Sequence, residues 1–62
     1  MLTLKINTDN AAFEDNGVGS EVAVILRRLA NNIEDLEGRD LDESFALMDS
    51  NGNKVGNAFL VP

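Results

Sequence analysis

The sequence predicts an α+β fold of order β-α-β-β, in which one helix packs on one face of a three-stranded, mainly antiparallel sheet. Three observations predict it: an alternating N-terminal segment, one long amphipathic stripe, and an Asn-Gly pair between two strand-like runs. A chain of 62 residues forms one small domain, expected over 1–62, because one helix on a small sheet uses up the core that such a length can bury.

The first strand is expected over residues 2–7. Apolar and polar side chains alternate there, as in a half-buried strand: Leu2, Leu4 and Ile6 alternate with Thr3, Lys5 and Asn7. The polar residues 8–10 end the strand, because Asp and Asn close local turns. A connection then runs to about Gly19, and we expect Phe13 to anchor it in the core.

The helix is expected over residues 20–37, where apolar side chains recur at helical spacing. Ser20 is the expected N-cap, Glu21 lies in the first turn, and Gly38 is the expected left-handed stop. The stripe that should face the sheet consists of Val22, Ile25, Leu26, Leu29, Ile33 and Leu36.

The C-terminal third predicts a hairpin with strands over 44–48 and 54–61, because Asn51-Gly52 between strand-like runs favours a tight turn. The last strand is expected in the centre of the sheet. We expect Leu4, Ile6, Phe45, Leu47, Val55 and Phe59 to face the helix. The open face would then carry Ala46, Met48, Ala58 and Leu60 beside Thr3 and Lys5, and a bulge at Gly52 or Gly56 would exchange the two faces.

Catalysis and metal binding are not expected. The chain has no His and no Cys, so Ser-His, Cys-His and thiolate sites are excluded. The loop from Asp49 to Asn53 differs from a calcium loop, because its Gly stands fourth and Leu60 occupies the place of the final Glu. An Asx-stabilised turn is the favoured interpretation. No enzyme activity, cofactor or metal is therefore predicted.

The net charge of −6 is concentrated between residues 34 and 43. That segment holds one base, Arg39, and six acids, which are Glu34, Asp35, Glu37, Asp40, Asp42 and Glu43. Such a charge disfavours direct binding to nucleic acid or to an anionic membrane, and it favours a basic protein surface. The alternative is that the acidic run only keeps a helix end and a loop solvated.

Two apolar surfaces are further candidates for partner binding. Val24 is expected on the polar side of the helix beside Arg27 and Arg28, which makes a small apolar spot with a basic rim. Met48 and Leu60 are expected on the open sheet face, where small apolar residues around a Met suit a partner or a second copy of the chain.

Three stretches carry a family resemblance. Residues 8–13 resemble the TDNAAF opening of very small proteins of phages, prophages and plasmids, residues 21–30 are similar to their EVARILRxLA helix, and residues 47–56 to their closing LxDxNGNxVG hairpin. Val24 departs from the Arg of that pattern, and Met48 from a polar or basic residue. The resemblance implies a phage-like origin and assigns no activity.

The sequence therefore favours a non-catalytic, acidic protein-binding module of phage or mobile-element type, which inhibits a host-defence or nucleic-acid-binding protein in the cytoplasm of a bacterial host. The first alternative is a structural or accessory protein that forms a homodimer through the open sheet face. A sponge for a small signalling nucleotide is a weaker alternative, because phosphate capture needs basic side chains or amide nests. No apolar run approaches the roughly 20 residues of a membrane span, and the N-terminus has no signal-peptide pattern.

Overall fold

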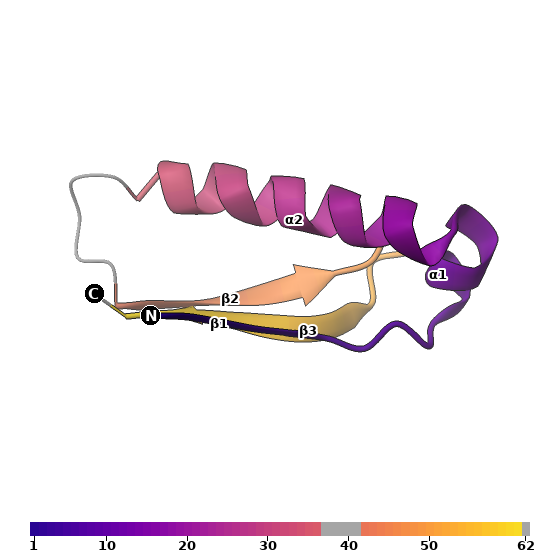
Figure 1. Cartoon of the computed structure of the whole chain (residues 1–62), viewed down its shortest axis with the longest axis horizontal. Helices are drawn as coiled ribbons and strands as arrows, with labels where there is room; N and C mark the ends of the chain where they lie inside the picture. Colours follow the sequence, from indigo (N-terminus) through magenta and orange to yellow (C-terminus); the bar gives the residue numbers. More distant parts are fainter. Residues whose placement is uncertain (37–41, 62) are drawn as a thin grey trace.

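The computed structural model describes residues 1–36 and 42–61, and it confirms the small α+β fold. The described elements are β1 (Leu2–Ile6), α1 (Ala11–Asn16), α2 (Val18–Glu34), β2 (Glu43–Met48) and β3 (Lys54–Leu60). Figure 1 shows α2 lying along one face of the sheet, with α1 at one end. The molecule is elongated, with extents of 38 × 17 × 16 Å.

The three strands form one antiparallel sheet of order β1-β3-β2, so β3 is central, as predicted. Leu4 lies opposite Ala58 on one side of β3, and Phe45 lies opposite Ala58 on the other. Gly52 takes a φ of 83° in the hairpin turn, a conformation that costs a side-chain-bearing residue free energy. The Asn51-Gly52 signal therefore located the turn correctly.

The connection between β1 and α2 contains a second helix, α1, that the sequence reasoning missed. Phe13 in this helix is only 1% exposed, which confirms it as the anchor of the connection. Gly17, with a φ of 87°, separates α1 from α2. The chain changes direction at Gly17, and Phe13 and the apolar side of α2 pack in the same core.

The expected bounds of the long helix were wrong at its N-terminus. α2 begins at Val18, and Gly17 rather than Ser20 occupies the N-cap position, without a side-chain capping bond. The expected C-terminal bound was wrong as well, because α2 stops at Glu34 with Asp35 as C-cap, and Leu36 lies beyond the helix. The expected stop at Gly38 and the last expected helical residue, Glu37, lie outside the described residues.

The apolar stripe is confirmed at four of its six positions; Leu26 is 41% exposed, and Leu36 lies beyond the end of α2. Ile25 and Leu29 are buried, while Val22 and Ile33 pack on the core more loosely. Successive helical residues are about 100° apart, so Leu26 lies to one side of the buried pair. The core consists of Phe13, Ile25, Leu29, Leu47, Val55 and Ala58.

The predicted faces of β3 are wrong beyond its first residues, because β3 contains a bulge. Leu47 pairs with Gly56 and Met48 with Lys54, so Val55 is the extra residue. Val55 is buried, and every later side chain of β3 lies on the opposite face from the one that alternation from Val55 would give. Ala58 is therefore fully buried, whereas Phe59 is 53% exposed. Leu60 shares the helix-facing side with Ala58.

Candidate functional site

Among the described residues, the buried polar side chains are two carboxylates, Glu21 and Asp49, which join α1, α2 and the hairpin turn. Glu21 and Asp49 are each 2% exposed. The backbone N–H of Ser50 donates to Glu21 at 2.7 Å, and the Ser50 hydroxyl donates at 2.8 Å. Asn16 donates to the same carboxylate at 3.1 Å. The sequence reasoning had placed Glu21 only in the first helical turn, and nothing local to it indicated burial.

Asp49 holds the hairpin turn closed. Its Oδ1 accepts the backbone N–H groups of Asn51 at 3.0 Å and Asn53 at 2.8 Å. The Asn10 side chain, which immediately precedes α1, donates to its other oxygen at 3.0 Å. This is the predicted Asx-stabilised turn, and its amide groups point at the carboxylate where a calcium ion would need oxygen ligands.

Hydrogen bonds set the ionisation of both carboxyl groups. The Ser50 hydroxyl is the main cause that lowers the pKa of Glu21, and burial and the nearby charge of Asp49 oppose it. The Asn10 amide is the main cause that lowers the pKa of Asp49, with burial again opposing. No buried side-chain N or O atom of the described residues lacks a partner. These hydrogen bonds tie α1, α2 and the hairpin turn together and thereby stabilise the fold.

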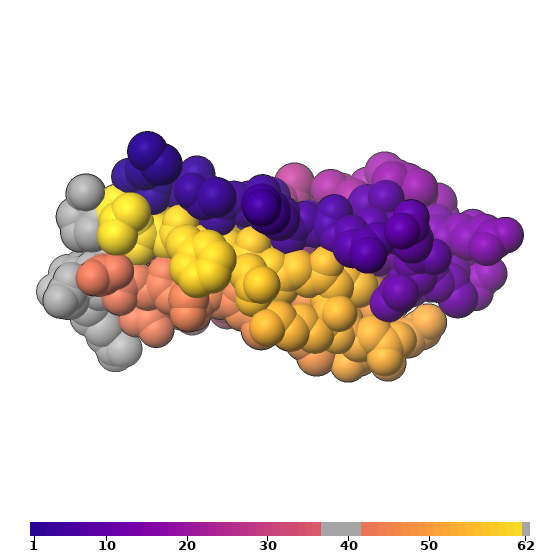
Figure 2. Space-filling model, turned by 90° about the horizontal axis from the view of Figure 1, so that it is seen from below, coloured from indigo at the N-terminus to yellow at the C-terminus, as the bar shows by residue number. Residues whose placement is uncertain are grey.

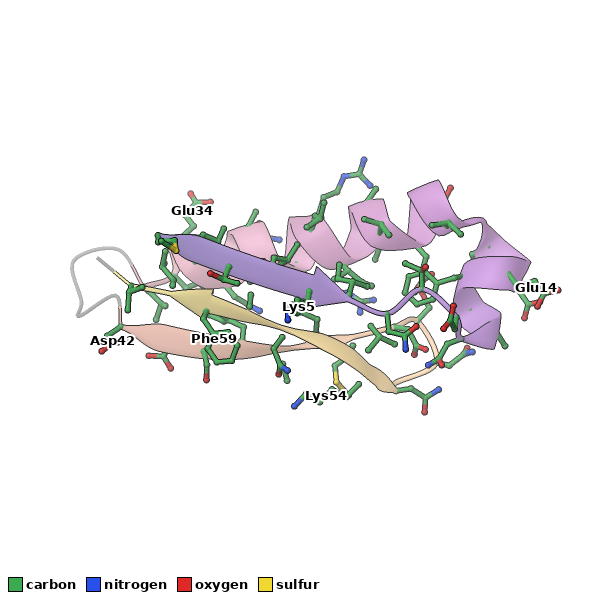
Figure 3. The ribbon with its side chains drawn as sticks, turned by 60° about the horizontal axis from the view of Figure 1, so that its bottom comes forward. Lys5, Glu14, Glu34, Asp42, Lys54 and Phe59 are labelled. Carbon is green, nitrogen blue, oxygen red and sulfur yellow. The ribbon has the colours of Figure 1, made fainter. Side chains whose placement is uncertain are left out.

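The acidic run gathers at the opposite end of the molecule. Glu34 and Asp35 end α2, while Asp42 and Glu43 begin the return into the sheet, and all four are exposed. Figure 3 shows Glu34 and Asp42 at the same end, far from Glu14 on α1. Glu37 and Asp40 lie outside the described residues. The fold thus brings acids from two elements together at one tip, here called the acidic end.

One residue from each of the two expected apolar surfaces, Arg28 and Met48, lines the same groove, whereas Val24 and Leu60 do not. A shallow groove of about 130 Å³ runs between α2 and β2, and Arg28 and Met48 both line it. Its other lining residues are Ile25, Leu29, Asn32, Ala46 and Leu47. Ligand pockets usually exceed about 300 Å³, so this groove suits one protruding side chain better than a whole small molecule. Val24, one helical turn before Arg28, is half-buried.

The open sheet face differs from the predicted one. Ala58 and Leu60 do not lie on it, because the bulge turns both toward the helix side. The exposed ring of Phe59 takes their place, with Ser44 and Thr3 as its neighbours across the sheet. Figure 2 shows β1, β3 and β2 side by side on this face. Both lysines, Lys5 and Lys54, are exposed in the strands.

Three groups of exposed residues were not recognised from the sequence. Phe59 was assigned to the core, and its exposure depends on the bulge. Leu4, 37% exposed, was expected to face the helix, and Leu26, 41% exposed, was expected to face the sheet; Leu2, in the same alternation as Leu4, is 49% exposed. Sequence alternation could find the apolar side of β1 but not the fact that α2 covers it incompletely.

No family model matches the chain, and neither a curated protein nor a solved structure matches it. None of the helices in the described part of the chain is long and apolar enough to cross a membrane. Within the described residues there is also no group of three acidic, His or Cys side chains placed to hold a metal ion.

Proposed function

We propose that this protein is a non-catalytic binding module of phage or mobile-element type that attaches to a basic surface of a host protein, such as a nucleic-acid-binding or defence protein, and occludes it. The observation that carries the proposal is the acidic end. Four carboxylates from α2 and the start of β2 converge there: Glu34, Asp35, Asp42 and Glu43. The Met1 ammonium lies at the same tip, since Leu2 and Glu43 both pair with Leu60. The carboxylates outnumber it, and their excess negative charge attracts an oppositely charged partner over a distance.

The sequence adds to this charge. Residues 34–43 carry six acids and one base, a net charge of −5 out of −6 for the whole chain. The described Lys and Arg side chains lie elsewhere: Lys5 and Lys54 are in the sheet, and Arg27 and Arg28 are in the middle of α2. This uneven distribution of charge supports a partner that the protein approaches with its acidic end first.

The groove beside β2 supplies the short-range contact in this proposal. It shares a flank with the acidic end, because β2 begins at Glu43 and reaches the groove at Ala46 to Met48. At about 3.4 Å per residue, Glu43 and Met48 are roughly 17 Å apart. One partner surface can span that distance, with an apolar side chain in the groove and basic side chains at the acidic end. Arg28 at the rim would select an acceptor on the partner.

The experiment compares two triple variants that remove the same charge from opposite ends. Glu34→Gln, Asp35→Asn and Glu43→Gln neutralise the acidic end, while Asp9→Asn, Glu14→Gln and Asp15→Asn neutralise exposed acids near α1. Each protein is immobilised and exposed to lysate of a bacterial host at low and high salt. We expect one host protein to be retained at low salt by the wild type and the α1-end variant. It should be lost from the acidic-end variant.

Two results would refute the proposal. The first is that the wild type retains no host protein even at low ionic strength, where attraction between exposed charges is least screened. The second is equal loss of the retained protein from both triple variants, which would mean that net charge alone, and not the acidic end, causes retention. Far-ultraviolet circular dichroism of both variants checks that the fold is intact.

A further inference from the structure

The outer edge of β1 presents a regular set of unpaired backbone groups. Val61 donates its N–H to Met1 O at 3.0 Å, and Asn7 donates its N–H to Val55 O at 2.8 Å. In an antiparallel pair, residues alternate in the direction of their N–H and C=O groups. The odd-numbered residues of β1 therefore bond to β3. Leu2, Leu4 and Ile6 direct their N–H and C=O groups away from the sheet.

The side chains beside this edge are apolar on one face. Leu2 and Leu4 lie on the helix-facing side, opposite Leu60 and Ala58, yet they are 49% and 37% exposed. The reason is the position of α2, whose Arg28 and Asn32 flank the groove beside β2. Leu26, on the other side of the buried residues of α2, is 41% exposed. An open strand edge next to exposed leucines can pair with another strand and bury the leucines in the same contact.

We propose that this edge binds a second copy of the chain, β1 against β1, in an antiparallel two-fold pair centred on Leu4. Leu4 then faces Leu4 of the other copy, and Leu2 faces Ile6. All three residues direct their backbone groups outward, so each facing pair is a hydrogen-bonded pair. The two sheets join into one six-stranded sheet with both α2 helices on the same side, because the two-fold axis is perpendicular to the sheet.

The same register also gives compatible side-chain neighbours on both faces of the joined sheet. The exposed leucines of the two β1 strands meet beneath the two copies of Leu26. On the open face Lys5 lies opposite Thr3 of the second copy, so the two lysines do not face each other. A shift by one residue would place leucines opposite lysines and is excluded by the pleat.

Charge also favours β1 over the other sheet edge. Antiparallel pairing places the acidic ends of the two copies at opposite ends of the dimer, and residues 1–8 contain no acid. At β2, in contrast, Asp42 immediately precedes the strand and Glu43 is its first residue. Arg28 of α2 lines the groove beside this strand. β1 carries one such feature, Lys5, but it has no acid, proline or bulge, the other features that usually prevent edge pairing.

The test uses the absence of Cys in the natural chain. In a hydrogen-bonded pair the two Leu4 Cα atoms are about 5.5 Å apart, within disulfide range of about 4.4–6.8 Å. The two Thr3 residues are diagonal neighbours, more than about 7 Å apart. Under mild oxidation Leu4→Cys should become a covalent dimer almost completely. Thr3→Cys and Ala46→Cys, on the open face of β1 and on the β2 edge, should remain largely monomeric.

Sedimentation of the unmodified protein gives an independent measurement. Interfaces below about 1,200 Å² are often weak, so the concentration series should extend to about 1 mM. The expected result is a concentration-dependent increase from the monomer mass of 6.7 kDa to twice that mass, abolished in Leu4→Glu with the circular dichroism unchanged. A strictly monomeric wild type would overturn the proposal. So would preferential crosslinking through Thr3→Cys or Ala46→Cys, and so would crosslinking at no position.

Discussion

Ala58 provides the sharpest test of the face assignment, because the same substitution has opposite expected signs on the two faces. Ala58 is 0% exposed and lies between Leu4 and Phe45 beneath α2. Ala58→Val adds two methyl groups to a filled site, and overpacking of this kind costs about 1–3 kcal/mol. On an exposed face the change would be neutral or slightly stabilising, since Val favours strands over Ala.

The loss expected for Ala58→Val is large relative to the total stability of this chain. A domain of 62 residues has a free energy of unfolding of roughly 3–9 kcal/mol at 0.05–0.15 kcal/mol per residue. With an m-value of about 1 kcal/mol/M for a small protein in urea, the loss lowers the urea midpoint by about 1–3 M. Unfolding followed by circular dichroism measures this shift directly.

Ala46→Val is the matched control, because Ala46 is exposed in β2 and pairs with Asn57. Its urea midpoint should stay equal to the wild-type value or rise slightly. The reasoning is refuted if Ala58→Val is as stable as the wild type, or if Ala46→Val loses as much stability as Ala58→Val. Either outcome would mean that the bulge at Val55 does not set the faces of β3.

Two further predictions concern backbone contact and pH. A Cβ at Gly56 would lie 1.9 Å from Lys5 O, whereas one at Gly19 meets nothing within 4 Å. Gly56→Ala should therefore lower the free energy of unfolding by at least about 1–3 kcal/mol, and Gly19→Ala in α2 should raise it by up to about 1 kcal/mol; equal urea midpoints for the two variants would contradict this. Glu21 and Asp49 have lowered pKa values in the folded state, so they stabilise it above their unfolded pKa values of about 4, and this contribution is lost as the pH falls through the folded values. The difference in urea midpoint between wild type and Glu21→Gln should accordingly be largest at pH 7 and shrink below about pH 4, and a difference independent of pH would show that hydrogen-bond geometry, not ionisation, is what Glu21 contributes.

The local elements followed from the sequence because short-range physics decides them. Alternation over Leu2–Ile6, helical spacing through Ile25 and Leu29, and the Asn51-Gly52 turn each act within a few residues. A hairpin and a helical connection between the first two strands allow only a few arrangements of a three-stranded sheet. The central position of β3 was therefore correctly predicted. The clustering of acids between Glu34 and Glu43 is likewise a property of the sequence alone.

The short helix α1 was missed because its six residues are too few to show an apolar period. This helix is stabilised by Phe13, which packs in the core from a segment where no helix or strand was predicted. Similarly, Glu21 is an ordinary first-turn acid in sequence, and only the approach of Ser50, 29 residues later, makes it a buried acceptor.

The sequence by itself determined that this is a small α+β domain with an acidic segment and without His or Cys. The tertiary structure alone decided which surfaces are available. One extra residue at Val55 buries Ala58 and exposes Phe59, because side-chain direction along a strand has a period of two and any insertion reverses it. The placement of α2 toward β2 leaves Leu2, Leu4 and Leu26 uncovered, because a single helix is too narrow to cover three strands equally.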